Sequence, residues 1–385
     1  MKYKLVNDTI SYQEIESLSD WIKTNPKLTK GNLTIEFENK FSRYIGSRYS
    51  VFVNSGSSAN LAMIYSLMIS KKLKNNKIVV PSLSWVTTVS PIMQFGLTPI
   101  MCDTCQYTLG INVEHFEQIC KDQSPSAVII VHALGFPNKM KEIVDICDRY
   151  GVILLEDSCE SVGSKYDGKN TGTIGLMGSF STYYGHHFST IEGGIICTDD
   201  QELYNILLSI RSHGWSRDLE ESERIKLQMK YNISDFDNMY TFYYPGFNLR
   251  STDLQAYIGI NQIDRLNQFV ISRNRNLSYY DKHLNNSYWK INLGEFEFVS
   301  NFAYPVISPN RDKIIKKLYE SGVETRPLIC GNMANQPFFK NIYGHVDGLT
   351  FANTIHKYGF YLPNNPDMTE SDIKHICSIV NEFST

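Results

Sequence analysis

The sequence predicts an α/β protein with a large, mainly parallel sheet and a smaller C-terminal α/β domain. Short apolar, β-branched runs alternate with amphipathic stretches up to about Asp264, which is typical of a parallel sheet covered by helices on both faces. Beyond that residue, one long helical stretch through Asn276 precedes short strands and helices. We therefore expect one domain over residues 1–264 and a second over residues 265–385, a division that suits a chain of 385 residues.

Six short apolar runs are the expected strands of the large sheet. They contain few alternating polar residues, which is typical of strands buried on both faces. In chain order they are residues 51–53, 78–80, 99–102, 127–131, 152–155 and 195–198. Amphipathic stretches at residues 58–73 and 139–150 are expected helices between them. Because ligands of such sheets collect beyond the carboxyl ends of the strands, we expect the functional residues there.

Composition limits the classes of function. The chain has 37 Lys and Arg residues against 40 Asp and Glu residues, a net charge of −3, which gives no electrostatic reason to expect nucleic acid or a membrane as a partner. The N-terminus has no apolar signal core, and no stretch approaches the roughly 18 apolar residues of a membrane span. Eight cysteines without regular spacing indicate reduced thiols. We expect a cytoplasmic protein without a metal site.

Residues 54–60, NSGSSAN, follow an expected strand and open an expected helix. Small residues there let backbone N–H groups approach an anion, and the helix dipole adds partial positive charge. A phosphate site around Gly56 and Ser57 is the functional interpretation. A plain serine N-cap is the structural alternative, and this motif alone does not decide between them.

Residues 179–194, SFSTYYGHHFSTIEGG, follow the acidic strand end LLED at residues 154–157. They resemble the cofactor segment of the sugar aminotransferase family around DegT, DnrJ, EryC1 and StrS, in which F-S-F-x-x-x-K precedes a Gly-Gly pair. The family's lysine binds pyridoxal 5′-phosphate covalently. Here His186 stands in its place, and no lysine occurs between Lys169 and Lys226. The resemblance therefore implies a cofactor site that cannot serve an ordinary aminotransferase.

The resemblance also implies the fold-type I architecture of aspartate aminotransferase and a set of cofactor contacts. Asp157 would pair with the pyridine nitrogen, although a helix-capping Asp is common at a strand end. Trp85 would stack on the pyridine ring, the alternative being a core tryptophan. Glu160 stands where relatives have Gln or His near the cofactor's 3-hydroxyl, so it departs from the pattern. The residues that would hold the phosphate are Gly56, Ser57 and Ser181.

Later blocks resemble family motifs that imply a partner subunit and a substrate. Asn248, in GFNLRSTDLQA, matches an asparagine that reaches the neighbouring subunit's cofactor, which implies a homodimer with shared active sites. The blocks containing Arg326 (ETRP) and Asn332 (GNMANQP) resemble those bordering the nucleotide-sugar site. Arg217 and Arg250 are candidates for binding the L-glutamate carboxylates by paired hydrogen bonds, and either could instead be a structural ion-pair partner.

With a histidine in place of the lysine, the segment resembles that of the sugar 3-dehydratase branch of the family. That branch implies removal of the C3 hydroxyl from a nucleotide-linked 4-keto-6-deoxy sugar by pyridoxamine phosphate, with L-glutamate regenerating the cofactor. The expected substrate is GDP-4-keto-6-deoxy-D-mannose, in dideoxysugar synthesis for lipopolysaccharide O-antigen or capsule. His186 would be the base, because an imidazole with an ordinary pKa of about 6.5 suits proton transfer at neutral pH. His187 is expected to be a packing or hydrogen-bonding neighbour.

Two other interpretations stay open. One is the CDP-sugar 3-dehydrase branch, which carries a [2Fe–2S] cluster. Such a cluster needs clustered thiolates, whereas beyond His186 the chain has only Cys197, Cys330 and Cys377. The other is a non-catalytic homologue that binds the cofactor, for which the sequence offers no feature of its own.

Overall fold

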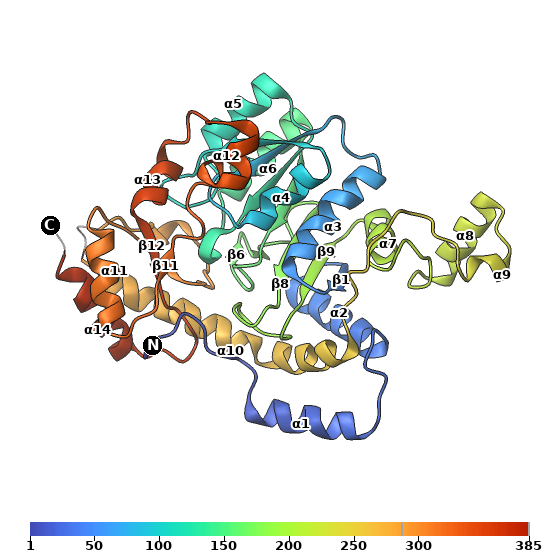
Figure 1. Cartoon of the computed structure of the whole chain (residues 1–385), viewed down its shortest axis with the longest axis horizontal. Coiled ribbons are helices and arrows are strands. Elements are labelled where there is room, and N and C mark those ends of the chain that lie inside the picture. Colours follow the sequence, from blue (N-terminus) through green and yellow to red (C-terminus); the bar gives the residue numbers. More distant parts are fainter. Residues whose placement is uncertain (286–287, 384–385) are drawn as a thin grey trace.

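The computed structural model describes residues 1–285 and 288–383 (Figure 1). Its large sheet has seven strands in the order β1-β9-β8-β5-β4-β2-β3. Neighbouring strands are parallel except at β9, which is antiparallel to both β1 and β8. The strands are β1 (Tyr49–Val53), β2 (Lys77–Pro81), β3 (Thr98–Cys102), β4 (Ala127–Val131), β5 (Ile153–Asp157), β8 (Met177–Ser181) and β9 (Gly194–Thr198). The prediction of a mainly parallel sheet is confirmed, and so are the six predicted strands.

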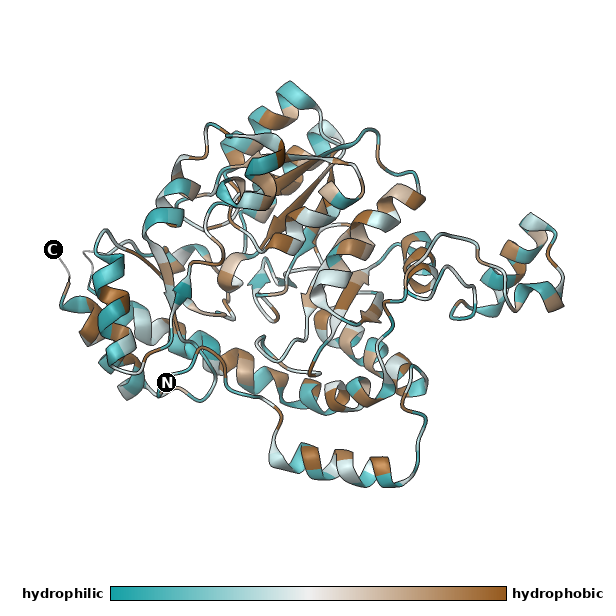
Figure 2. Cartoon of the chain, in the orientation of Figure 1, coloured by the Kyte–Doolittle hydropathy of each residue, from teal (hydrophilic) through white to brown (hydrophobic). Residues whose placement is uncertain are grey.

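Helices cover both faces of this sheet, because successive strand residues point to opposite sides. Ile78 and Val80 of β2 pack with α3 (Gly56–Ile69), α4 (Val86–Gln94) and α7 (Gln201–Ile210). Val79 packs on the other side with α5 (Val113–Gln123) and α6 (Met140–Tyr150). Phe52 and Phe180 extend that second face to α2 (Asn32–Ile45) and α10 (Asp253–His283). Figure 2 shows the strands between these layers in the brown of hydrophobic residues.

The C-terminal part has its own antiparallel sheet, in the order β10-β12-β11. Its strands are β10 (Tyr304–Ile307), β11 (Arg326–Pro327) and β12 (Gly359–Leu362), packed with α11 (Arg311–Glu320) and α14 (Glu370–Asn381). The segment with α12 (Pro337–Tyr343) and α13 (Thr350–Tyr358) instead places Phe339 and Ala352 in the core of the large sheet. The predicted boundary at residue 264 falls inside α10, which runs without a break to His283.

Two parts of the chain stand away from the body in Figure 1. One is α1 (Tyr12–Lys23), and the other is a lobe that carries α8 (Glu221–Tyr231) and α9 (Asp235–Asn238). Neither α8 nor α9 has a buried residue. The remaining short elements are β6 (Lys165–Tyr166), β7 (Lys169–Asn170), η1 (Ala133–Gly135), η2 (Leu293–Glu295) and η3 (Met333–Asn335).

Candidate active site

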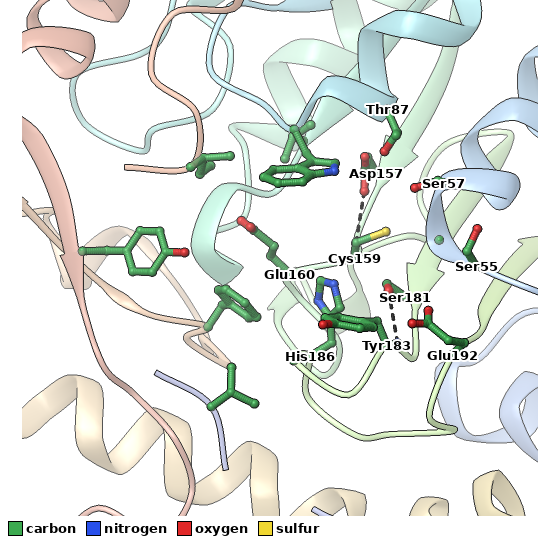
Figure 3. A pocket seen from close by; sticks show the side chains of 18 residues that line it. Ser55, Ser57, Thr87, Asp157, Cys159, Glu160, Ser181, Tyr183, His186 and Glu192 are labelled. Carbon is green, nitrogen blue, oxygen red and sulfur yellow. Dashed lines mark hydrogen bonds between the residues drawn. The ribbon is translucent and has the colours of Figure 1, made fainter. Parts of the chain in front are cut away.

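A cavity of about 430 Å³ lies beyond the carboxyl ends of β5 and β8 (Figure 3). Segments far apart in sequence form its wall, from Val6 near the N-terminus to Tyr361 on β12. The structure brings seven of the predicted site residues together in this wall. They are Gly56, Ser57, Trp85, Asp157, Glu160, Ser181 and His186.

One end of the cavity is the N-terminus of α3. Ser55 is its N-cap, and the Ser55 side chain accepts a hydrogen bond from the Ser58 amide at 3.0 Å. The first amides of an α-helix have no partner within the helix, so those of Gly56 and Ser57 can serve a ligand. A Cβ at Gly56 would lie 2.7 Å from Ser181 Cβ and 3.2 Å from Cys159 Sγ. Only glycine therefore leaves this end open, and the geometry suits an anion.

Asp157, the last residue of β5, is a buried carboxylate in the cavity wall. Its Oδ2 accepts hydrogen bonds from Asn60 Nδ2 at 2.7 Å and from Thr88 Oγ1 at 2.9 Å. Its Oδ1 accepts one from the Cys159 amide at 3.2 Å. These neutral donors hold the carboxylate in one orientation and leave its negative charge available to a cationic group in the cavity.

Trp85 is a large flat wall of the cavity rather than a core residue. Its side chain is 56% exposed, which rules out the structural alternative of a core tryptophan. It occupies the N-cap position of α4 without a side-chain cap bond of its own. An indole face presented to a cavity in this way can stack on an aromatic ligand.

His186 lies in the loop between β8 and β9, and this loop is closely bonded. The Thr190 amide donates to the Thr182 carbonyl at 2.9 Å, and the Tyr184 amide donates to the Ile191 carbonyl at 3.1 Å. A Cβ at Gly193 would lie 2.3 Å from Thr182 Oγ1, so the two ends of the loop can pack this closely only because residue 193 is glycine. The loop thus fixes His186 in the wall of the cavity.

The His186 ring is held in its neutral form by its surroundings. Burial lowers its pKa to about 4, with Asp157 acting in the opposite direction. The ring is therefore neutral at pH 7. Its Nδ1 is buried, and no residue among 1–285 and 288–383 forms a hydrogen bond with it. The Phe302 ring, 5.4 Å away between centroids, packs beside it.

His187 is not among the residues that line this cavity, and it has the structural role that the sequence predicted. It is fully buried, and its Nε2 donates to the Ser300 carbonyl at 3.0 Å. The buried Arg273 supports the same loop, because its guanidinium donates to the carbonyls of His186 at 3.4 Å and Phe302 at 3.0 Å. Together they hold the backbone behind His186.

Five predicted residues lie outside this cavity. Asn248 is exposed, and Arg250 donates to Ser212 Oγ at 2.9 Å. Arg217 stacks on Trp215 in the lobe, with its guanidinium carbon 3.8 Å from the ring centroid. Arg326 pairs with Glu324 at 2.6 Å. The buried Asn332 caps η3 and donates to Asn353 at 2.8 Å.

The sequence analysis did not single out several wall residues. Tyr183 was within reach of prediction, because it lies three residues before His186 in the same motif. Val6, Phe302 and Tyr361 come from three distant segments. No local pattern marks them, because only the folded chain brings them to the site.

These residues fit a pyridoxal phosphate. The open end at Gly56 suits its phosphate, Asp157 suits a protonated pyridine nitrogen, and Trp85 suits its ring face. Within the described ranges, no three His, Cys, Asp or Glu side chains gather as a metal ion would require. A search of the same residues finds no helix with the length and apolarity to cross a membrane.

Comparisons with known proteins find relatives that match almost the whole chain. The profile of the DegT/DnrJ/EryC1/StrS aminotransferase family matches residues 8–381. The chain is 35% identical over 393 residues to GDP-4-keto-6-deoxy-D-mannose 3-dehydratase of Yersinia pseudotuberculosis, covering 99% of both proteins. It is 36% identical over 374 residues to the Escherichia coli O55:H7 protein of that name, covering 93% of each.

A crystal structure of GDP-4-keto-6-deoxymannose-3-dehydratase with a trapped PLP–glutamate geminal diamine superposes with a TM-score of 0.90. The sequence identity is 32%, and the superposition covers 98% of this chain and 99% of that one. The expected fold-type I architecture is thereby confirmed. With a matching profile over almost its whole length and relatives above 30% identity, the chain belongs to the DegT/DnrJ/EryC1/StrS aminotransferase family.

Proposed function

We propose that the chain is a nucleotide-sugar 3-dehydratase that uses pyridoxal and pyridoxamine phosphate. It removes the C3 hydroxyl from GDP-4-keto-6-deoxy-D-mannose, and L-glutamate returns the cofactor to the amine form. The observation that carries this proposal is that His186, which the sequence motif matches to the family's lysine position, lies in the wall of a cavity that fits the cofactor. Two relatives above 30% identity bear the name of this activity.

Each part of the cavity has one task in holding the cofactor. The amides of Gly56 and Ser57, with Ser181, bind the phosphate; Asp157 binds the pyridine nitrogen; and Trp85 covers the ring. When bound, the cofactor supplies an amine that joins the keto carbon of the sugar and a ring that withdraws electrons. The side chains of Phe302 and Val6 add apolar surface to the wall, which would limit the access of water to the reaction.

His186 moves the proton. Because burial lowers its pKa to about 4, the imidazole is uncharged at neutral pH. Its Nδ1 forms no hydrogen bond with the described residues, so this nitrogen can face the substrate as a base. It would take the proton that the bound cofactor loses at its C4′ carbon and return it to the C3 hydroxyl, which would leave as water. A lysine here would tether the cofactor, whereas histidine leaves it free to exchange between the sugar and glutamate.

We also propose a homodimer with shared active sites. The lobe supports this, because Met229 and Phe236 are each 77% exposed and Tyr240 is 71% exposed. Exposed apolar side chains in such number mark an interaction surface. Arg217 lies in this lobe, and Asn248 and Arg250 lie in the segment that follows it, paired with Ser212 and Val53. All three lie outside their own cavity, so we assign them to the partner's cofactor, glutamate or substrate. Arg326 and Asn332 remain our candidates for the nucleotide-sugar side.

We place the enzyme in the cytoplasm. All eight cysteines are free thiols, and six of them are buried. Free thiols in this number suit a reducing compartment.

The test compares wild type with His186→Lys. Pyridoxal phosphate is added to each protein, followed by borohydride reduction and mass spectrometry. We expect the cofactor to become covalently bound only in His186→Lys. Wild type should bind it reversibly, convert it with L-glutamate to pyridoxamine phosphate, and then release water from the GDP sugar at C3. A wild type that binds no cofactor, or that ignores glutamate, would refute the proposal.

A further inference from the structure

The cavity wall is polar at its phosphate end and mostly apolar where the two ends of the chain close it. The polar side chains of the phosphate end are those of Ser55, Ser57, Thr87, Asp157 and Ser181. The N-terminal segment and the C-terminal part contribute Val6, Phe302, Ile329 and Tyr361. The hydroxyl of Tyr361 is the single polar group among these four side chains. In Figure 3 the orange and red ribbons of the C-terminal part border the side of the cavity away from Ser57.

Two of the apolar side chains lie beside the proposed base. The centroid of the Phe302 ring is 5.4 Å from that of the His186 ring. Val6 reaches the residue next to it, since its Cγ2 would lie 3.7 Å from a Cβ built at Gly185. Because His186 would act on the atoms at which sugar and cofactor join, side chains beside it border the bound sugar.

Hydrogen bonds on both sides of Val6 hold it in the wall. Before it, the Leu5 amide donates to Glu324 Oε2 at 3.1 Å. After it, the Thr9 carbonyl accepts from Gln262 Nε2 at 3.0 Å. The N-terminal segment is thus attached to the C-terminal part and to α10, and Val6 lies between the two attachments.

Ile329 has a backbone conformation that is unusual for its side chain. Its φ is 51°, in the left-handed region that disfavours residues branched at Cβ. The Gly331 amide donates to the Leu328 carbonyl at 2.9 Å, which closes the turn around it. Glycine adopts this conformation without strain, yet the chain has isoleucine here, with its side chain buried in the cavity wall. A strained residue at a cavity indicates a task for its side chain.

The chemistry of the substrate leaves one group that suits this apolar surface. A nucleotide-linked hexose carries hydroxyl groups on most of its carbon atoms, and each needs a hydrogen-bond partner when it leaves water. In a 6-deoxy sugar the methyl group at C6 is the exception. It is attached to C5, next to the C4 carbon that joins the cofactor, so it lies close to the reacting atoms when the sugar is bound.

We propose that Val6, Phe302 and Ile329 form an apolar subsite for the C6 methyl group of the sugar, and that this subsite selects 6-deoxy sugars against sugars with a C6 hydroxyl. The inference rests on the proposed function, because it requires a sugar that joins the cofactor at C4. A C6 hydroxyl in this place would lose its hydrogen bonds to water and meet the carbon atoms of these three side chains.

The test compares two GDP sugars that have no keto group and therefore bind without reacting. GDP-6-deoxy-D-mannose carries the methyl group, and GDP-D-mannose differs from it only by a hydroxyl at C6. Isothermal titration calorimetry of the protein loaded with pyridoxamine phosphate gives both dissociation constants. A hydrophobic pocket disfavours an added hydroxyl by up to about a hundredfold. We expect wild type to bind the 6-deoxy sugar about ten- to a hundredfold more tightly.

Two substitutions place a hydroxyl in the subsite and keep the branching at Cβ. They are Val6→Thr, which also keeps the volume of the side chain, and Ile329→Thr. Each should reduce the preference for the 6-deoxy sugar at least about threefold, because the new hydroxyl can pair with a C6 hydroxyl and disfavours a methyl group. Ile15→Thr is the matched control, because Ile15 is 49% exposed on α1, and it should keep the wild-type preference.

The ratio of the two constants separates this inference from a purely structural role, which would weaken the binding of both sugars alike. A preference that shrinks in both variants and persists in the control supports the inference. Equal affinity for the two sugars in wild type, or a ratio that neither variant changes, overturns it. The proposed function survives that result if L-glutamate still converts the bound cofactor. A wild type that binds neither GDP sugar refutes the inference and the proposed substrate together.

Discussion

At the scale of residues, burial in one cavity has opposite effects on two side chains. Loss of water disfavours the charged form, so burial lowers the pKa of His186 and raises that of Glu160. Near neutral pH the imidazole of His186 is then uncharged, and the carboxyl of Glu160 is still partly protonated. The charge of Asp157 remains as the feature that attracts a protonated ring nitrogen. Residues of one cavity wall thus set both the protonation state of His186 and the charge available for cofactor binding.

Gly56 is a residue whose missing side chain defines the site. In Gly56→Ala the new Cβ would meet Ser181 Cβ at 2.7 Å, so Ser181 must move out of its place in the cavity wall. Gly56 is not in the left-handed region, so alanine itself suits the helix. We expect the dissociation constant for pyridoxal phosphate to rise at least about tenfold, which is about 1.4 kcal/mol. We also expect a lower Tm, because Ser181 Cβ can move only with the backbone of β8.

Equilibrium dialysis and thermal unfolding measure these two effects. Gly294→Ala is the matched control, because its Cβ would meet only Asn292 Oδ1, at 3.3 Å, far from the cavity. If Gly56→Ala binds the cofactor as wild type does, the α3 N-terminus is not the phosphate site.

At the scale of elements, the strands with apolar, β-branched sequences could be predicted and β8 could not. Its sequence, MGSFS, contains residues with low strand propensity. It is a strand because β5 and β9 bond to its two edges. Gly178 is needed there because a Cβ would lie 2.1 Å from the Gly172 carbonyl oxygen. The strand forms because of its pairing with β5 and β9 and because the backbone of Gly172 can approach Gly178 closely. Neither contact can be read from the local sequence.

The site shows the same division between local and long-range information. Motifs predicted the residues of the large domain that follow strands, because each lies within a few residues of a recognisable strand end. Phe302 and Tyr361 reach the cavity through the packing of the second sheet, and Val6 through an N-terminal segment bonded to Gly322 and Glu324. The side chain of Asn332 turned out to cap η3, which its motif did not indicate.

The start of α2 depends on a side chain from α10. Its own N-cap, Gly31, offers no side-chain bond. Asp253 supplies the missing cap. Its carboxylate accepts hydrogen bonds from the amides of Gly31 at 2.7 Å and Thr34 at 3.0 Å, and from Thr34 Oγ1 at 2.7 Å. Asp253→Ala would leave these donors unsatisfied in a buried place. We expect the free energy of unfolding to fall by about 2 kcal/mol.

Urea unfolding followed by circular dichroism checks this value. Asp20→Ala is the control, because Asp20 forms only an exposed pair with Lys23 on α1, and such pairs contribute little. Equal losses in the two variants would show that the Asp253 cap is not a significant source of stability.

At the scale of the whole molecule, α10 connects the two sheets. Its first half packs on α2 and the large sheet, where Ala256 and Phe269 are buried. Its second half packs on the C-terminal sheet, where Leu277 and Tyr280 are buried. Both parts of the chain that α10 connects contribute to the cavity wall. Asp157 and His186 come from the part before this helix, and Phe302 and Tyr361 come from the part after it. One continuous helix therefore joins the two parts of the chain that form the cavity wall.

The lobe gives the last prediction, which concerns the assembled molecule. Phe236 is 77% exposed on α9, and in the proposed homodimer it would be buried. Burying one phenylalanine contributes about 2 kcal/mol. In a two-fold dimer each subunit buries its own Phe236, so the substitution removes this contribution twice. We therefore expect Phe236→Asp to weaken the dimer by about 4 kcal/mol, which raises its dissociation constant about a thousandfold.

Analytical ultracentrifugation of wild type and variant across a range of concentrations measures this change. Tyr319→Asp is the matched control, because Tyr319 is 68% exposed on α11, away from the lobe. The control should remain a dimer at concentrations where Phe236→Asp is a monomer. Because Asn248 would reach the partner's cofactor, the monomeric variant should also bind pyridoxal phosphate more weakly. A wild type that is monomeric throughout, or a variant as dimeric as the control, would exclude the lobe as the subunit interface.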